Sequence, residues 1–271
     1  MQIKDVMNTN PYTLTEDNTI LSASQYMAKE KIRNLPVTDS NKKLLGLITL
    51  REIIDAWSRD PRKTLIKETM LTKITTVEPS MPLKGAIEMM IINKFGCLPI
   101  TENNNLVGFV TETDMLGKLY ELVELKHDKT LVKEIMDSKL CSMIEENDIS
   151  EVSELMKKEK IRNLAIVDKD KKLKGLITLR EIVNALSLIY GTEKISIKTA
   201  MLIQIATIDS EALLQTAVET MLANKYGCLP VVEADNTLIG IISENILLKC
   251  LYSQIKVPED FFTQRLGKYF M

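Results

Sequence analysis

The chain carries one short pattern four times, and this repetition constrains its fold more than any other feature. In each copy an apolar stretch ending in Gly-x-x-Thr or Gly-x-x-Ser is followed at once by residues typical of a helix start. The copies are GLITLRE at 46–52, GFVTETD at 108–114, GLITLRE at 175–181 and GIISENI at 240–246. A second pattern precedes each: RNLPV at 33–37, GCLPI at 96–100, RNLAI at 162–166 and GCLPV at 227–231. Such spacing predicts a fold built from four similar units.

The four units form two pairs. Residues 29–54 and 158–183 align without a gap and are mostly identical, whereas the second unit matches the fourth. The order is therefore A-B-A′-B′, which indicates that a pair of units was duplicated whole. We predict units at 1–62, 63–125, 126–190 and 191–253, with a separate tail at 254–271.

Each unit reads as strand, helix, strand, strand, helix. In the second unit Leu83, Ala86, Ile87 and Met90 recur at the spacing of an amphipathic helix, and the other three units repeat this register. We expect Gly96, and Gly227 in the fourth unit, to terminate these helices as C-caps.

Two apolar strands follow in the second unit, joined by the Asn-rich turn 102–105, and a last helix begins near Glu112. Asparagine tolerates the positive φ angles of tight hairpins. Two helices on one face of a small sheet leave its other side open, and this explains why the units come in pairs.

The composition is that of a globular protein that lies in the cytoplasm by default. The chain is 45% hydrophobic and 27% charged, and no apolar run is long enough to span a membrane or to form a signal-peptide core. The net charge of −2 disfavours binding to nucleic acid. Lysines do crowd the turns near 42–43 and 169–174, where we expect solvated hairpin tips rather than a nucleic-acid surface.

The sequence contains none of the common catalytic signatures. His127 is the only histidine, and there is no nucleophile elbow or phosphate-binding loop. The four cysteines form no CxxC, so a metal has no ligand set, and Cys97 and Cys228 are interpreted as small buried apolar residues. We therefore expect a protein that is not an enzyme and has no catalytic cofactor.

Thr111 and Asp114 are the strongest candidate binding residues. Thr111 ends a strand and precedes a helix, so an anion can bind at that helix N-terminus. Asp114 lies one turn along, where a carboxylate can accept hydrogen bonds from a ribose diol. The alternative is that Thr111 and Asp114 only cap the helix.

The element order, the repeat length, the LPV-type strand and the Gly-x-x-Thr/Ser-x-x-Asp ending together resemble the CBS domain, named for cystathionine β-synthase. The resemblance covers about residues 4–56, 66–119, 132–186 and 197–251 and implies an α/β (α+β) fold of two tandem CBS pairs. It also implies an adenine nucleotide as ligand (AMP, ADP or ATP), because family members usually hold its ribose and phosphate at these Thr and Asp positions.

The other units depart from this ending. The first and third have glutamate at the acid position, with the pairs Thr49/Glu52 and Thr178/Glu181, whereas the fourth has Ser243 and then Ile246. The predicted order of occupancy is therefore the second unit first, the first and third next, and the fourth empty.

Other residues near the predicted cleft have two readings each. Arg33 and Arg162 either clamp phosphates of a ligand on the facing unit or form surface salt bridges. For Arg51 and Arg180 we favour solvated side chains. The resemblance implies that the strand with Cys97 and Pro99 offers backbone groups to the edge of the adenine ring.

The residues 120–131 that join the pairs are not rich in Gly, Pro or Ser, which favours docking of the two pairs within one chain. A homodimer remains an alternative. We expect a regulatory protein that binds an adenine-containing molecule and passes its state to an unknown partner protein. The rival hypothesis is an interaction scaffold without a ligand. The sequence does not choose among AMP, ADP, ATP, a cyclic dinucleotide and S-adenosylmethionine.

Overall fold

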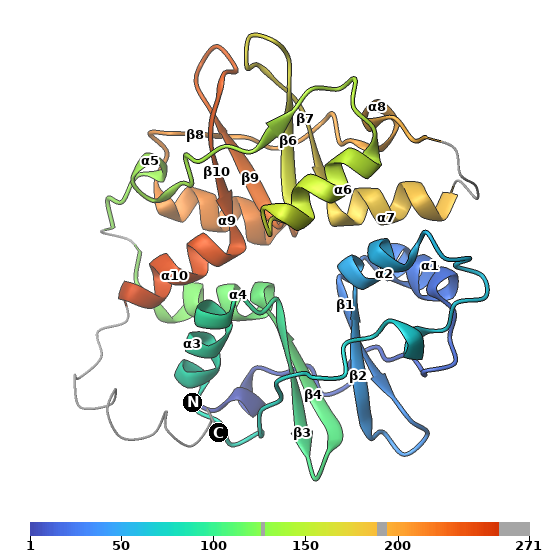
Figure 1. Cartoon of the computed structure of the whole chain (residues 1–271). Coiled ribbons are helices and arrows are strands. Elements are labelled where there is room, and N and C mark those ends of the chain that lie inside the picture. The colour runs from blue at the N-terminus through green and yellow to red at the C-terminus, as the bar shows by residue number, and fades with distance from the viewer. Residues whose placement is uncertain (126–127, 189–193, 255–271) are drawn as a thin grey trace.

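A computed structural model of the chain describes residues 1–125, 128–188 and 194–254. In these residues helices alternate with short hairpins, which confirms the predicted mixed α/β class (Figure 1). The first two units contain the 3-10 helices η1 (Ile3–Asp5) and η2 (Ile66–Glu68), the α-helices α1 (Ile20–Glu30), α2 (Leu50–Ala56), α3 (Leu83–Asn93) and α4 (Glu112–Leu122), and the strands β1 (Asn34–Thr38), β2 (Leu44–Thr49), β3 (Cys97–Glu102) and β4 (Asn105–Thr111).

The third and fourth units repeat this order, with a four-residue α-helix in the place of each 3-10 helix. Their helices are α5 (Val132–Ile135), α6 (Ile149–Lys158), α7 (Leu179–Leu188), α8 (Ile197–Ala200), α9 (Leu214–Asn224) and α10 (Glu244–Gln254). Their strands are β5 (Ser142–Met143), β6 (Asn163–Val167), β7 (Leu173–Thr178), β8 (Ile208–Asp209), β9 (Cys228–Val232) and β10 (Leu238–Ser243). The first strand of each unit is short. It is a two-residue strand in these two units and a single bridge in the others, Leu14 to Val37 and Val77 to Ile100.

The amphipathic helices form where the apolar stripes predicted them. All four stripe residues of α3 are buried, and so are those of α1 and α9. In α6 three of the four stripe residues are buried, and the fourth, Ser153, is partly exposed. Burial of one apolar face supplies most of the stability of helices this short.

The central strands of each unit pair as antiparallel hairpins, as expected. The register joins Cys97 to Thr111 and Pro99 to Phe109 in the second unit, with a bulge near the turn. Asn103 and Asn104 have φ angles of 50° and 66° at this turn, and Lys42, Lys171 and Asn236 are left-handed at the other three. These residues close the tight turns that the sequence predicted.

The helix ends differ from the prediction. Gly96 and Gly227 are not C-caps, because no described glycine has a positive φ. Lys94 and Lys225 take the left-handed cap conformation, with φ of 55° and 56°. Gly96 and Gly227 lie instead against arginine side chains of the other pair, which are described below.

The starting segment of each unit pairs with a hairpin strand of the other unit in its pair. Asn8 exchanges two backbone hydrogen bonds of 3.0 Å with Phe109, and Leu71 exchanges two of 2.9 Å with Leu47. The second pair repeats both exchanges, through Asp137 with Ile241 and through Leu202 with Leu176. The two units of a pair are therefore interlocked by their starting segments. The predicted unit boundaries stay a prediction.

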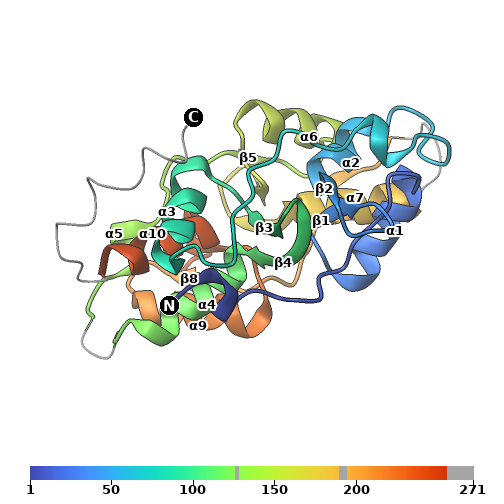
Figure 2. The ribbon, with the colours of Figure 1, turned by 90° about the horizontal axis from the view of Figure 1, so that it is seen from below.

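The turns of the two hairpins in a pair also bond to each other. The Leu44 amide donates to the carbonyl of Asn104, and the Leu106 amide donates to the carbonyl of Lys42. Leu173 and Leu238 make the equivalent bonds in the second pair. Figure 2 shows α1 and α2 on one side of the hairpins of the first pair and α3 and α4 on the other.

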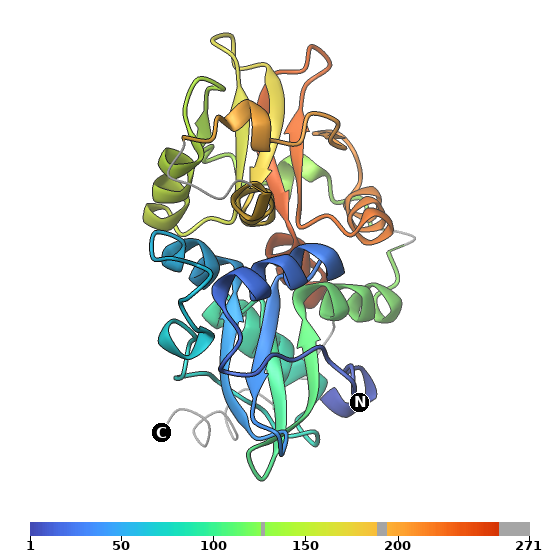
Figure 3. The same cartoon turned by 90° about the vertical axis from the view of Figure 1, so that its right-hand side faces the viewer.

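The two pairs dock on each other within the chain. Helices α1 and α2 of the first unit pack on α7 of the third, and α4 of the second unit packs on α9 and α10 of the fourth. Two large apolar cores result, and each draws buried residues from both pairs. The helices form the middle layer, and the hairpins extend from it toward opposite ends (Figures 1 and 3). The lysine-rich turns at 42–43 and 169–174 thus lie at opposite ends and form no common patch.

Candidate functional site

The first turns of α2, α4, α7 and α10 each follow directly after a strand, and they carry most of the predicted binding residues. Thr111 is the N-cap of α4. Its hydroxyl donates to a carboxylate oxygen of Asp114 at 2.7 Å, and its amide donates to the same oxygen at 2.8 Å. The Asp114 amide in turn donates to the Thr111 hydroxyl at 3.3 Å. In the structure Thr111 and Asp114 therefore cap the N-terminus of α4.

This cap leaves Asp114 accessible. Its side chain is exposed, and Thr111 is half-buried. The exposed carboxylate can therefore accept further hydrogen bonds, and the positive end of the α4 macrodipole lies beside it. Capping and ligand binding are compatible at this turn.

The other three turns are less open or lack the acid. Thr49 caps α2, with a hydrogen bond to Glu52, which is half-buried. Thr178 bonds to Glu181 in the same way, but Glu181 is buried. At α10 the Ser243 hydroxyl accepts only a long bond, 3.4 Å, from the amide of Ile246.

Arg33 lies where three units meet, and its partners come from two of the other units. Its guanidinium donates to both carboxylate oxygens of Glu244, at 2.7 Å from Nη1 and 3.0 Å from Nη2. Nη2 also lies 3.1 Å from the hydroxyl oxygen of Thr113, which in turn bonds to Glu244. Because Thr113 belongs to the first turn of α4, the arginine of the first unit touches the turn that holds Asp114.

The ion pair of Arg33 and Glu244 is largely removed from solvent. The Glu244 side chain is 4% exposed and that of Arg33 is 30% exposed. Burial alone would lower the pKa of Arg33, but the charge of Glu244 and the hydrogen bonds to it raise that pKa overall. Arg33 is therefore a permanent cation that is held between the pairs.

Arg162 makes the equivalent contact across the same interface. Its Nη1 donates to Glu112 at 2.7 Å, and its Nη2 donates to the carbonyl of Lys94 at 3.0 Å. The Glu112 side chain is 5% exposed. Burial raises the pKa of the Glu112 carboxyl, and the charge of Arg162 opposes this only in part.

These contacts explain why residues 96 and 227 are glycines. A β-carbon on Gly227 would lie 2.8 Å from Nη1 of Arg33, and one on Gly96 would lie 3.1 Å from Nη1 of Arg162. Arginine and glycine occupy the same position of the repeat, arginine in the first and third units and glycine in the second and fourth. The long side chain of one pair therefore fills the space that the other pair leaves empty.

The prediction of solvated side chains for Arg51 and Arg180 is wrong. Arg51 donates to the carbonyl of Ile161 at 2.9 Å, and Arg180 donates to that of Lys31 at 3.0 Å, so both bridge the pairs. Burial, together with the charge of Arg33, lowers the pKa of Arg180. The helix docking that brings these residues into contact was not readable from their local sequence.

Cys97 and Pro99 lie in β3 beside this interface, and both are buried. Burial raises the pKa of the Cys97 thiol to about 12, and that of Cys228 also to about 12, as expected for small buried residues. The Pro99 carbonyl already accepts a hydrogen bond from the amide of Val77 at 3.2 Å. Among the described residues, no cluster of three or more His, Cys, Asp or Glu side chains could hold a metal ion.

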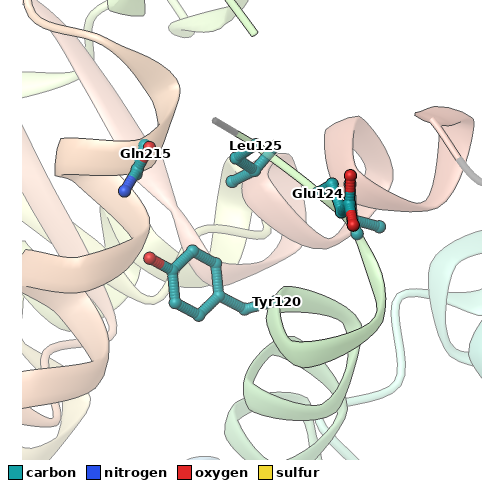
Figure 4. Close-up of a pocket in the computed structure, with 5 residues that line it drawn as sticks. Tyr120, Glu124, Leu125 and Gln215 are labelled. Carbon is teal, nitrogen blue, oxygen red and sulfur yellow. The ribbon is translucent and has the colours of Figure 1, made fainter. Parts of the chain in front are cut away.

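Two surface hollows lie away from these turns. One, of about 250 Å³, is formed by the end of α4 and by α9, with Tyr120, Glu124, Leu125 and Gln215 around it (Figure 4). The other, of about 300 Å³, lies beside the turn at Asp168. Neither includes a predicted site residue. His127 and residues 255–271 of the predicted tail lie outside the described residues.

Sequence reasoning did not assign Glu112, Thr113 or Glu244 to the interface. Glu112 and Glu244 take the repeat position that is leucine in the first and third units, Leu50 and Leu179. The first and third units thus have arginine with leucine, and the second and fourth have glycine with glutamate. This pattern could have indicated ion pairs between the units.

Comparison with known proteins defines the class. The sequence model of the CBS domain matches residues 3–59, 66–121, 132–188 and 197–253. The chain therefore belongs to the CBS-domain family and contains four such domains in two tandem pairs, which confirms the resemblance found in the sequence. Among the described residues, no helix is both long and apolar enough to cross a membrane.

The similar proteins include one of the same overall architecture. The uncharacterized protein MJ1225 of Methanocaldococcus jannaschii is 25% identical over 190 residues, which are 66% of this chain and 68% of that protein. Its crystal structure matches with a TM-score of 0.83 over 92% of this chain and 99% of that chain, at 22% identity. An uncharacterized conserved protein of Pyrococcus horikoshii matches with a TM-score of 0.63, over 93% of this chain and 100% of that one, at 18% identity.

An enzyme that contains a related segment also matches. Inosine-5'-monophosphate dehydrogenase of Nitrosopumilus maritimus is 31% identical over 111 residues. The match spans 41% of this chain and 22% of that enzyme. Similarity to this segment therefore says nothing about catalysis by the present chain.

Proposed function

We propose that the protein is a non-enzymatic regulator that binds an adenine nucleotide at the first turn of α4 and conveys occupancy to a partner protein. The observation that carries the proposal is the open Asp114 carboxylate at the N-terminus of α4. That turn combines an acceptor for a ribose diol with a helix end and a nearby arginine for a phosphate. CBS-domain membership and the MJ1225 relative, which has been proposed as an archaeal homologue of g-AMPK, support this reading.

The exposure of the acids supports a single preferred site. Asp114 is exposed, Glu52 is half-buried and Glu181 is buried, while the fourth unit has Ile246 in place of the acid. A buried acid that already bonds to its capping threonine is a poor acceptor for a diol. We therefore propose the site of the second unit as the principal one, with the first unit as a weaker second.

The scaffold reading is the rival function. It is favoured by the replacement of aspartate in three of the four units. It predicts stable binding to a partner protein with no response to nucleotides.

Thermal unfolding of the whole chain against AMP, ADP, ATP, S-adenosylmethionine and GMP separates these readings. A ligand that binds only the folded state at one hundred times its Kd adds about 2.7 kcal/mol to the free energy of unfolding. The proposal expects a shift with one or more adenine ligands and none with GMP. No shift with any ligand would favour the scaffold.

A further inference from the structure

The contacts of Arg33 differ from those of its repeat equivalent, Arg162. Arg33 reaches two other units at once, through Thr113 in the second and Glu244 in the fourth. Within the described residues Arg162 bonds only to the second unit, through Glu112 and Lys94. In the fourth unit Asn245 takes the place of Thr113, and its buried Nδ2 has no hydrogen-bond partner in the part of the chain that the structure describes. The pseudo-symmetry is thus broken at the turn that carries Asp114.

We propose that the ion pair of Arg33 and Glu244 is a ligand-gated latch between the two CBS pairs. The inference rests on the proposed function and names how that site is regulated. In the described state Glu244 holds the guanidinium of Arg33 through both carboxylate oxygens. A ligand phosphate on the first turn of α4 exchanges for Glu244 as the anion on Arg33 and so separates the first unit from α10.

The geometry brings the competing anions to one guanidinium. Thr113 precedes Asp114 in the same helical turn, and Arg33 Nη2 lies 3.1 Å from its hydroxyl oxygen. A 5′-phosphate is joined to the ribose ring only through C5′ and O5′, so a ribose bound to Asp114 keeps its phosphate close to this turn. Arginine binds phosphate and carboxylate with the same planar donors, so one anion replaces the other without a new residue.

The exchange couples the ligand to the arrangement of the pairs. The Glu244 side chain is 4% exposed, and a buried charge that loses its partner is strongly destabilised. Release of Arg33 therefore moves the equilibrium toward an arrangement in which Glu244 reaches water. By linkage, Glu244 weakens phosphate binding by the same factor by which phosphate weakens the Glu244 contact.

The experiment measures AMP and adenosine affinity by calorimetric titration of the full chain and its variants. Glu244→Gln keeps the shape of the side chain but removes its charge. We expect it to bind AMP at least fivefold more tightly than wild type and adenosine with unchanged affinity. Unchanged or weaker AMP binding by a folded Glu244→Gln protein would overturn the latch.

A double variant covers the case in which Glu244→Gln fails to fold. Arg33→Met with Glu244→Gln leaves no unpaired charge, and we expect its preference for AMP over adenosine to be smaller than that of wild type, because only the N-terminus of α4 remains to bind the phosphate. An unchanged preference for AMP in this variant would contradict the latch. Lys157→Met is the matched control, because it removes an exposed ion pair between the same two pairs, Lys157 to Asp55 at 3.0 Å. It should change neither affinity.

Failure of the latch and failure of the proposed function give different results. If wild type binds none of AMP, ADP, ATP, S-adenosylmethionine and adenosine, while its fold is intact, the nucleotide site itself is wrong. If wild type binds AMP and the Glu244→Gln variant behaves like wild type, the site stands and only the latch is wrong.

Discussion

Arg33 lies directly against Gly227, so closely that a β-carbon on the glycine would be 2.8 Å from the guanidinium nitrogen Nη1. These two residues occupy the same position of the repeat in units that face each other across the interface. The Arg33 side chain passes Gly227 and forms its ion pair with Glu244. Glycine at position 227 therefore leaves the space that Arg33 of the first unit needs to reach Glu244. Interface specificity is thus encoded by the alternation of arginine and glycine along the chain.

Replacement of this glycine is expected to weaken docking of the pairs. Gly227→Ala forces Arg33 to move, and overpacking of this kind costs roughly 1–3 kcal/mol. Gly96→Ala should cost less, because its β-carbon would lie 3.1 Å from Arg162. Urea unfolding of the two variants measures both effects. Equal stability of wild type and Gly227→Ala would show that the arginine has room to shift freely.

Gly117→Ala in α4 is the control for the glycine substitutions, and we predict that it raises the stability of the protein. A β-carbon there would meet Leu222 of α9 at 3.8 Å, an ordinary packing distance. Because alanine is favoured over glycine inside a helix, Gly117→Ala should stabilise the protein by about 0.5–1 kcal/mol. The unfolding midpoint should rise, and a fall would mean that α4 and α9 approach more closely than described.

The buried Glu112 carboxyl gives stability a pH dependence of unusual sign. Burial raises its pKa in the folded state, so the folded protein binds this proton more tightly than the unfolded chain. Wild type should therefore gain stability relative to Glu112→Gln as pH falls from neutral through the raised pKa toward the ordinary value for glutamate. Unfolding free energies at several pH values test this. A relative loss of wild-type stability over that range would mean that Arg162 dominates the shift.

The N-cap of α6 should show the opposite dependence. Asp148 accepts a hydrogen bond from the hydroxyl of Ser150 and, at 2.9 and 3.1 Å, from the amides of Ser150 and Glu151. These hydrogen bonds, first of all the one from the Ser150 hydroxyl, lower the pKa of Asp148. Asp148→Ala should cost about 1 kcal/mol, as is typical of a lost helix cap. Wild type holds this advantage above the ordinary pKa of aspartate and loses it as pH falls through the lowered one. Asp148→Asn retains the acceptor and serves as the control.

The sequence predicted local structure well because its signals are local. The stripe of Leu83, Ala86, Ile87 and Met90 and the Thr111 cap depend only on residues within a few positions. The interface partners were not predicted, because Arg33 and Glu244 are far apart in the chain and meet only through helix docking. Gly96 was misread for the same reason: its position after a helix suggested a cap, whereas its neighbour Arg162 comes from the other pair.

The binding residues remain predictions because one geometry serves two purposes. The hydrogen bonds between Thr111 and Asp114 cap α4, and the same turn would accept a ribose and phosphate. Only the exposure of Asp114, compared with the buried Glu181, separates a turn that is open to a ligand from one that is closed. Sequence alone could not give that exposure.

The most direct test of this account is the affinity of AMP for wild type and for Asp114→Asn, measured by calorimetric titration with Ser243→Ala as the control. Asparagine keeps the capping acceptor, so the fold should be preserved while the charged acceptor for the diol is lost. The account predicts that Asp114→Asn weakens AMP binding at least tenfold and that Ser243→Ala leaves it unchanged. Equal AMP affinity in wild type and Asp114→Asn would contradict the assignment of the site to the first turn of α4.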